Sequence, residues 1–495
     1  MATRRVVTTA LLAGALCVGA GAASAVPIPP DPRPPQSPAY VGAPATPKPV
    51  DVAAPPQHPF MAPNPGNNIH NDAYMTDAYR RMGPLGRKPV TTSTLQAAEC
   101  ASLTFDRRNR LETVCVGTNT VTLKLFDPTT LEELASFNLP PRRPGTGTFN
   151  DFSGGGYFYL DHRDRAVVPT STNHLYVVAQ TDEAGFRLAR DYDLTGAIGT
   201  EDKIVSVIPD WKGRLVFVTK AGVVGAVERG TGAVRTVDLG ETIANSFAVD
   251  DDGGVYVVTA KAMYRLDVTS SGKPRVTWRE VYDNSGVEKP GQVSAGSGTT
   301  PTVMGDKWVS ITDNADPMQV VVYKRGASVR GDREVCEAPV FRKGASATEN
   351  SLVGAGRRII VTNNYGYTGP TATSEGGVTT PGVERVDIDQ DGKGCHKVWA
   401  NDRLRSPSSV PKLALGNGLF YTVTKDPVEQ DPLGLEDAWY LTAFDARTGK
   451  RVFKVRYGTG LGFNVNYAPV TLGPDEETAY VGTLGGLVRI TDTTP

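Results

Sequence analysis

The segment at residues 204–220, IVSVIPDWKGRLVFVTK, decides the fold class of this 495-residue chain. Two short runs rich in Val, Ile and Phe flank a turn that carries Pro, Asp and Gly, a pattern typical of two antiparallel strands. Similar segments recur from one end of the chain to the other, and such recurrence is typical of repeat architectures. The other copies are ECASLTFDRRNRLETVCVGT (99–118), AVVPTSTNHLYVVAQ (166–180), IANSFAVDDDGGVYVVTA (243–260), TTPTVMGDKWVSITD (299–313), TENSLVGAGRRIIVTN (348–363), SVPKLALGNGLFYTVT (409–424) and YAPVTLGPDEETAYVGT (467–483).

These eight copies predict an all-β, eight-bladed β-propeller over residues 97–495. Each repeat has about 50 residues, enough for a four-stranded blade of short strands, and each copy is interpreted as the two inner strands of its blade. Blades have apolar faces that only their neighbours can cover, so they must close into a ring. The last repeat stops near Thr491, two strands into its blade. We therefore expect residues 88–96 to supply the missing strand and close the ring.

The N-terminal region divides into three segments. Residues 1–25 join a cationic start to a short apolar run and a small-residue end, which predicts a cleaved secretory signal and a secreted protein without a membrane span. Residues 26–66 are crowded with proline, which predicts an extended and disordered leader. Residues 67–96 mix aromatic, acidic and amide side chains, and we expect them to form a strap that docks on the propeller.

Charge and cysteine content limit the classes of partner. Without the signal, 50 basic residues face 53 acidic ones, so nucleic acid is not an expected partner. Four cysteines remain, an even number that predicts two disulfides in an exported chain. Three pairings are possible, and free buried thiols are an alternative. Position along the repeats favours Cys100 with Cys115 and Cys336 with Cys395.

A second signature lies in the outer half of several blades. In LTAFDARTGKRVF (441–453), Asp445 caps a turn, Gly449 takes positive φ, and Phe453 covers the gap between blades. LDVTSSGKPRVTW (266–278), VDIDQDGKGCHKVW (386–399) and FDPTTLEELASF (126–137) vary this pattern. The pattern resembles the blade repeat of the quinoprotein, or PQQ-binding-like, β-propeller superfamily, over roughly residues 97–494.

Polar residues open the repeats, where the first strand of each blade lines the central channel. Such residues converge on one axis although they are far apart in sequence, and they predict a site for a small polar ligand. Channel strands that merely meet water are the alternative. The candidate ligand-binding residues are Asn245, Thr300, Asn350, Asn363, Asn364, Tyr365 and Tyr467.

Glu349, Asn350 and Asp313 are the candidate metal ligands. Carboxylate and amide oxygens are the ligands that Ca²⁺ prefers. The resemblance implies the same, because quinoprotein dehydrogenases hold calcium beside the quinone with a Glu, an Asn and an Asp. Two departures argue against a PQQ enzyme, since the chain has neither adjacent cysteines nor a Cys-x-x-Cys-His for haem.

The strap supplies the other candidate catalytic residues. His70 could act as a base or a ligand, with Asp72 orienting it, if the strap folds over the channel. A purely structural strap that hydrogen-bonds across blades is the alternative.

Two classes of function remain open for this chain. The first is a monomeric extracellular protein that binds a small polar ligand, a glycan or a protein partner. The second is a calcium-assisted oxidoreductase or hydrolase with its site at the channel mouth, which would use Glu349, Asn350, Asp313 and His70.

Overall fold

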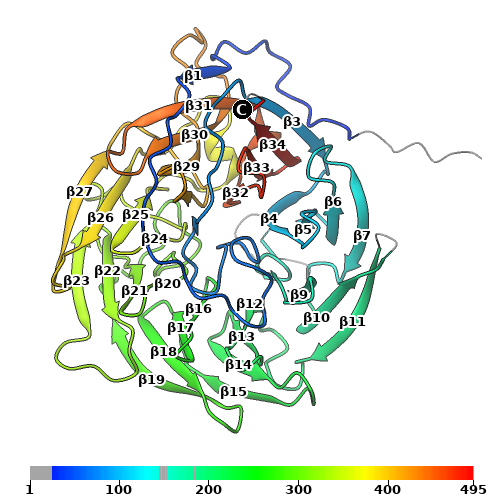
Figure 1. Ribbon diagram of the computed structural model, residues 1–495, viewed down its shortest axis with the longest axis vertical. Coiled ribbons are helices and arrows are strands. Elements are labelled where there is room, and N and C mark those ends of the chain that lie inside the picture. The colour runs from blue at the N-terminus through cyan, green and yellow to red at the C-terminus, as the bar shows by residue number, and fades with distance from the viewer. Residues whose placement is uncertain (1–24, 144–145, 148–150, 152, 183–184, 494–495) are drawn as a thin grey trace, which may run out of the picture.

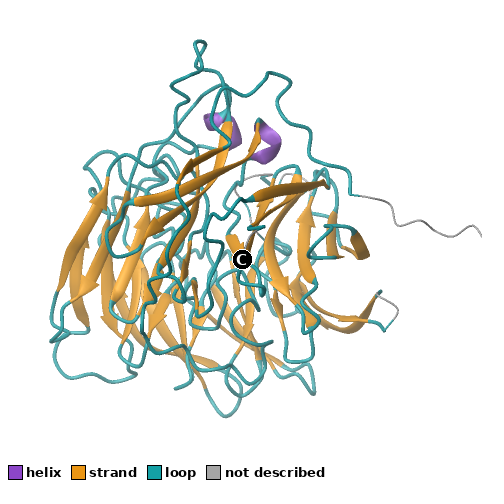
Figure 2. Ribbon diagram, turned by 45° about the horizontal axis from the view of Figure 1, so that its top comes forward, coloured by secondary structure: helices purple, strands orange, loops and turns teal. Residues whose placement is uncertain are grey.

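Eight β-sheets stand radially around one axis in the computed structural model, which describes residues 25–143, 146–147, 151, 153–182 and 185–493 (Figure 1). The predicted all-β, eight-bladed propeller is thereby confirmed. Two short 3-10 turns, η1 (Pro370–Thr373) and η2 (Leu461–Phe463), are the helical elements of the described chain (Figure 2). Within the described ranges, no helix is long and apolar enough to cross a lipid bilayer. Residues 1–24 of the predicted signal lie outside these ranges.

The first four blades are antiparallel four-stranded sheets, and their strands follow one another from the axis outward. Blade 1 holds β4 (Glu99–Phe105), β5 (Leu111–Val116), β6 (Val121–Phe126) and β7 (Glu133–Leu139). Blade 2 holds β8 (Tyr159–Leu160), β9 (Arg165–Pro169), β10 (His174–Gln180) and β11 (Phe186–Asp193). Blade 3 holds β12 (Ile204–Pro209), β13 (Leu215–Thr219), β14 (Val223–Val227) and β15 (Val234–Asp238). Blade 4 holds β16 (Ala248–Val249), β17 (Gly254–Val258), β18 (Ala262–Val268) and β19 (Pro274–Val281).

The remaining blades repeat this order, and two of them take strands from the N-terminal region. Blade 5 holds β20 (Thr302–Met304), β21 (Trp308–Thr312), β22 (Gln319–Lys324) and β23 (Glu334–Pro339). Blade 6 holds β24 (Val353–Ala355), β25 (Arg358–Thr362), β26 (Val383–Ile388) and β27 (Cys395–Asn401). Blade 7 holds β28 (Lys412–Ala414), β29 (Leu419–Thr424), β30 (Ala438–Asp445) and β31 (Arg451–Thr459), with β2 (Ala78–Tyr79) inside and β1 (Tyr40–Gly42) outside. Blade 8 holds β32 (Val470–Leu472), β33 (Thr478–Thr483), β34 (Gly486–Thr491) and β3 (Val90–Leu95).

The ring closes between the two ends of the chain. Strand β3 pairs antiparallel with β34 over its whole length, from Val90 opposite Thr491 to Leu95 opposite Gly486. The prediction that residues 88–96 complete the last blade is confirmed. One repeat differs from its interpretation, because the copy at 166–180 forms the second and third strands of blade 2. The inner strand there is β8, whose two residues are too few to leave a β-pattern in the sequence.

Burial follows the radial position of each strand. Central strands such as β13 and β17 are buried at every residue, because neighbouring blades cover both of their faces. The aromatic residues after the outer turns pack between blades, as the repeat pattern predicts. The Trp399 indole donates a hydrogen bond to the Ala446 carbonyl of blade 7, with N and O 3.1 Å apart. The Trp278 ring lies 6.3 Å from that of Tyr323 in blade 5.

Both predicted disulfides are present. Cys100 and Cys115 join β4 to β5 within blade 1, whereas Cys336 and Cys395 join the outer strands of blades 5 and 6. The second bond therefore ties two neighbouring blades at the rim, where the outer strands are partly exposed.

The proline-rich segment has a defined course where its composition predicts disorder. It crosses one face of the ring toward the centre, in blue in Figure 1. On the way β1 pairs with β31, and the Val50 amide donates to the Leu415 carbonyl at 2.8 Å. Ile28 is 3% exposed. Proline lacks a donor but keeps its carbonyl and an extended φ, so such a chain can lie along existing strands where its other amides bond to them.

Residues 66–81, to which the name strap is restricted from here on, contact every blade at the centre of the ring. Backbone carbonyls of the strap accept amide hydrogens from inner strands or residues beside them: Gly66 from Phe105, Asn67 from Leu160, Ala73 from Val249, Tyr74 from Val303, Thr76 from Gly354 and Asp77 from Leu413, at 2.8–3.2 Å. Arg81 donates to Leu472 of blade 8, and the Tyr74 ring lies 6.3 Å from Trp211 of blade 3. Most of these bonds fall at or near the C-terminal ends of the inner strands, so the strap closes that end of the channel.

Candidate functional site

A small cavity lies on the axis between the strap and the opposite end of the channel. Its volume is about 40 Å³, room for a few water molecules. Its wall contains Glu99, Glu349 and Asn466 from starts of inner strands, Tyr157 from the segment before β8, and His70 from the strap. The cavity is therefore bounded by the strap at one end and by these polar residues at the other.

Glu349 is the most constrained acid of this cavity. Its carboxylate accepts hydrogen bonds from Asn245 Nδ2 at 3.2 Å and from the Val293 amide at 3.1 Å. The Asn245 carbonyl oxygen in turn accepts from the Tyr157 hydroxyl at 3.2 Å. Glu349 is 6% exposed, and burial raises its pKa to about 8 because the charged form is desolvated there. The carboxyl is therefore largely protonated at neutral pH and can both donate and accept hydrogen bonds.

Glu99 is a second carboxyl of the cavity that sequence reasoning missed. Its Oε2 accepts from Asn466 Nδ2 at 3.0 Å, and burial raises its pKa to about 8. Asn466 also accepts a hydrogen bond from the Tyr367 hydroxyl at 3.1 Å. The signal was present, because Glu99 is the first residue of the first repeat and so occupies a polar opening like that of Glu349.

His70 enters the cavity wall from the strap. Its Nδ1 lies 3.0 Å from Asp77 Oδ2, and its ring stacks on Tyr157 with centroids 6.3 Å apart. The opposite nitrogen, Nε2, is buried and has no hydrogen-bond partner among the described residues. Asp77 also pairs with Lys412, which is fully buried and donates to the Ile69 carbonyl at 2.5 Å.

The prediction that Asp72 orients His70 is wrong, since Asp77 is its carboxylate partner. Asp72 instead accepts the Tyr74 amide at 2.9 Å and the Thr76 hydroxyl at 2.5 Å, which fixes a turn of the strap. Its pKa rises to about 7 because it is fully desolvated. Sequence spacing alone cannot distinguish the two acids, because Met75 and Asp77 take positive φ and the strap is not a regular element there.

The three predicted calcium ligands hold separate partners. Asp313 accepts the Gln319 and Ala315 amides at 2.7 and 3.2 Å, and Asn350 donates to the Ser409 carbonyl at 2.7 Å. Only Glu349 of the three lies in the cavity wall as described. The described chain also contains no cluster of three or more His, Cys, Asp and Glu side chains suited to a metal. These contacts do not form a cradle for calcium or a quinone, so we derive no step through either.

The other predicted ligand residues position the loops around Glu349. Asn364 accepts the Glu349 amide at 2.9 Å, and Asn363 accepts the amides of Ala347 and Tyr365 at 3.2 and 3.1 Å. The Thr300 amide donates to Ser351 Oγ at 3.2 Å, joining blades 5 and 6. These amides brace the entrance to blade 6 and so fix the Glu349 backbone.

A larger pocket adjoins the cavity at the end opposite the strap. This vestibule has a volume of about 550 Å³ and is formed by the loops 288–293 and 367–371 together with Tyr467. Tyr467 lines both spaces, and its ring meets the Tyr367 ring edge-on with centroids 5.3 Å apart. Its φ of 68° is left-handed, which costs a residue with a side chain about 1–2 kcal/mol. The fold holds this ring between vestibule and cavity at that cost.

No family model matches the chain. An uncharacterized protein of Archaeoglobus fulgidus is 28% identical over 322 residues, which cover 58% of this chain and 61% of that protein. The match thus spans about three fifths of the relative. Among solved structures, BamB from Moraxella catarrhalis has a TM-score of 0.47 at 12% identity, covering 79% of this chain and 93% of BamB. The WD40 domain of SCAP from fission yeast has a TM-score of 0.43 at 10% identity, covering 82% and 97%.

Proposed function

We propose that this propeller is an extracellular binding protein for a small polyhydroxylated ligand, which enters through the vestibule and contacts the cavity on the axis. The observation that carries the proposal is the wall of that cavity. It combines two desolvated carboxyls, Glu99 and Glu349, with a His70 nitrogen that has no partner in the described chain. Buried polar groups of this kind stabilise a complex when the ligand forms hydrogen bonds with them.

The vestibule supports a ligand of sugar size. Its volume of about 550 Å³ falls within the usual range of 300–1,000 Å³ for small-molecule pockets. Tyr367 and Tyr467 supply part of its wall together with polar loop residues, and a sugar ring presents both apolar and polar surface. The disulfides fit an oxidising compartment, which is consistent with secretion.

Calorimetric titration with glucose, galactose, mannose and xylose tests the proposal. Glycine, lysine and calcium chloride are titrated alongside as probes of the other ligand classes. We expect one sugar to bind the wild-type protein and to bind Glu349→Gln at least tenfold more weakly. Glu337→Gln is the matched control, because Glu337 is exposed and lies on β23, the outermost strand of blade 5. Absence of sugar binding, or binding that is unchanged in both Glu349→Gln and Glu99→Gln, contradicts the proposal.

A hydrolase is the second candidate, and the His70–Asp77 pair favours it. A carboxylate on Nδ1, with an Nε2 that has no partner among the described residues, is the arrangement of a general base. Nε2 would take a proton from water as the water oxygen attacks the substrate, and the proton would pass to the leaving group as its bond breaks. Turnover of p-nitrophenyl glycosides or p-nitrophenyl acetate that disappears in His70→Asn would support this function. A fall in the melting temperature when a chelator removes calcium would support the calcium prediction.

A further inference from the structure

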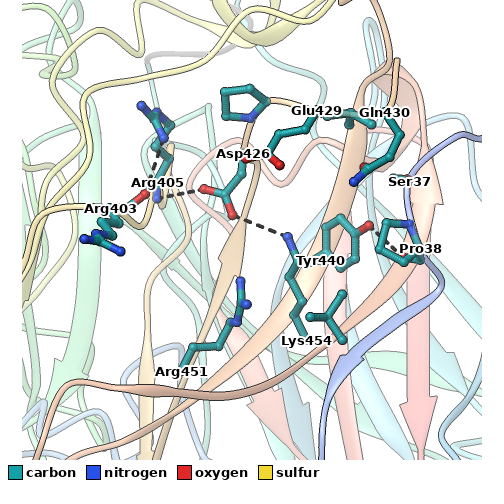
Figure 3. Close-up of a pocket in the computed structure, with 13 residues that line it drawn as sticks. Ser37, Pro38, Arg403, Arg405, Asp426, Glu429, Gln430, Tyr440, Arg451 and Lys454 are labelled. Atoms are coloured by element: carbon teal, nitrogen blue, oxygen red, sulfur yellow. Dashed lines mark hydrogen bonds and ion pairs between the residues drawn. The ribbon is translucent and has the colours of Figure 1, made fainter. Parts of the chain in front are cut away.

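A second pocket lies on blade 7, away from the axis, and has a volume of about 480 Å³ (Figure 3). Four segments form its wall: the docked leader before β1, the loop 402–411 between blades 6 and 7, the loop after β29, and strands β30 and β31. The leader wall is fixed in place, because Arg456 donates to Ser37 Oγ at 3.0 Å and Tyr440 donates to the Pro38 carbonyl at 2.7 Å. The pocket therefore exists only where the N-terminal segment is docked.

Basic side chains dominate this pocket. Arg403, Arg405, Arg451 and Lys454 line it together with two acids, Asp426 and Glu429. Asp426 is already engaged, since its carboxylate lies 3.5 Å from Lys454 Nζ and accepts the Arg405 amide at 3.4 Å. Figure 3 shows Arg403 and Arg405 on one side of the space and Lys454 and Tyr440 on the other, with Arg451 between them and near Lys454.

The three guanidinium groups lack carboxylate partners among the described residues. Other arginines of blades 6 and 7 are paired, for example Arg385 with Asp387 at 2.6 Å and Arg447 with Asp445 at 3.1 Å. Arg405 instead donates from Nη1 to the Arg403 carbonyl at 3.3 Å. Its Nε is buried and has no hydrogen-bond partner in the described chain. A buried donor without an acceptor is costly, and a bound anion would remove that cost.

We propose that this pocket binds an oxyanion group, a phosphate, sulfate or carboxylate, carried by a small ligand. Guanidinium groups present paired donors that match the geometry of these anions, and several of them around one space increase the attraction. The Lys454 ammonium lies 4.2 Å from the centre of the Tyr440 ring and is paired with Asp426, so the three arginines supply the positive charge that is free for an anion. The pocket is large enough to hold the rest of a ligand of monosaccharide size.

Calorimetric titration with sodium phosphate, sodium sulfate and sodium glucuronate tests the proposal on the whole protein. We expect at least one anion to bind, with affinity that falls as sodium chloride is raised from 20 to 300 mM. Arg451→Ala should weaken that binding at least fivefold, and Arg451→Lys should recover part of it. Arg451 is exposed, so neither change should disturb the fold.

Two controls separate this pocket from the channel. Arg235→Ala removes an exposed arginine of blade 3 and should leave anion binding unchanged. Glu349→Gln should also leave it unchanged, so failure of the sugar-binding proposal would not affect this result. The choice among the three anions identifies the ligand group. No binding by any of them, or equal binding by wild type and Arg451→Ala, would overturn the proposal.

Discussion

Glu349→Gln should make the stability of the propeller less dependent on pH. The wild-type carboxyl has a pKa of about 8 in the folded protein, against an ordinary value of 4.5. Folding therefore favours the protonated form. The stabilisation that results is fully present below pH 4.5 and is lost as the pH rises through 8. Glutamine has a similar shape and cannot ionise, so it removes this dependence.

The size of the effect follows from the two pKa values. Between pH 5 and pH 9, ionisation of Glu349 should cost the folded state about 4 kcal/mol. Unfolding entropies near 2.1 cal/mol/K per residue give about 1 kcal/mol/K for a chain of 495 residues. Over this pH interval the melting temperature of wild type should therefore fall about 4 °C further than that of Glu349→Gln.

Thermal melting by circular dichroism at pH 5, 6, 7, 8 and 9 measures the difference directly. Glu99→Gln should behave in the same way, because burial raises its pKa to a similar value. Glu201→Gln reports what an exposed glutamate contributes and should follow wild type at every pH. If wild type and Glu349→Gln differ by the same amount at pH 5 and pH 9, the carboxyl is hydrated and the cavity is not as described.

Three further predictions concern the strap and the rim. Lys412→Met leaves the Asp77 charge buried without its ammonium partner, so the free energy of unfolding measured in urea should fall by about 3–5 kcal/mol. The fall should be smaller in the double variant that also carries Asp77→Asn. Replacing Cys336 and Cys395 by serine should cost up to about 4 kcal/mol for a separation of 59 residues, and unchanged melting would show that the bond is dispensable. Desolvation lowers the pKa of His58 from 6.5 to about 3, so the folded protein should lose stability as the pH falls below 6.5, by about 3 kcal/mol at pH 4.5. In thermal melts at acid pH, the melting temperature of His58→Phe should fall less than that of wild type.

The fold was predictable because each blade leaves a local pattern. The hairpin at 204–220 and its relatives report strands and turns directly, and counting them gave both the number of blades and the strand missing from the last one. The two-residue strand β8 left no such pattern. Nor did the course of the leader, since a strand such as β1 is held by backbone bonds to β31, more than 400 residues away. Composition describes what a segment can do alone and does not report a distant partner.

The candidate site was predictable in position more than in pairing. The rule that inner strands begin at the channel led to Glu349, Asn245 and Tyr467, which the structure places at the cavity or in contact with its wall. Which acid meets His70 depends on the bends of the strap, and sequence spacing does not reveal them. Lys412 was also missed, although a lysine inside an apolar inner strand is itself a sign of a buried ion pair.

The strap also dictates the order in which this protein can be assembled. It is made before any blade, yet its hydrogen-bond partners extend to Leu472, close to the end of the chain. Its partners in blade 1 and blade 2 follow it directly in the chain, whereas the partners of Arg81 and of β3 belong to the last blade. Contacts of such long range make folding slow and leave strand edges open in the meantime. The proline-rich leader lacks many backbone donors, so it cannot pair along its whole length with the open strand edge of another chain before the ring closes.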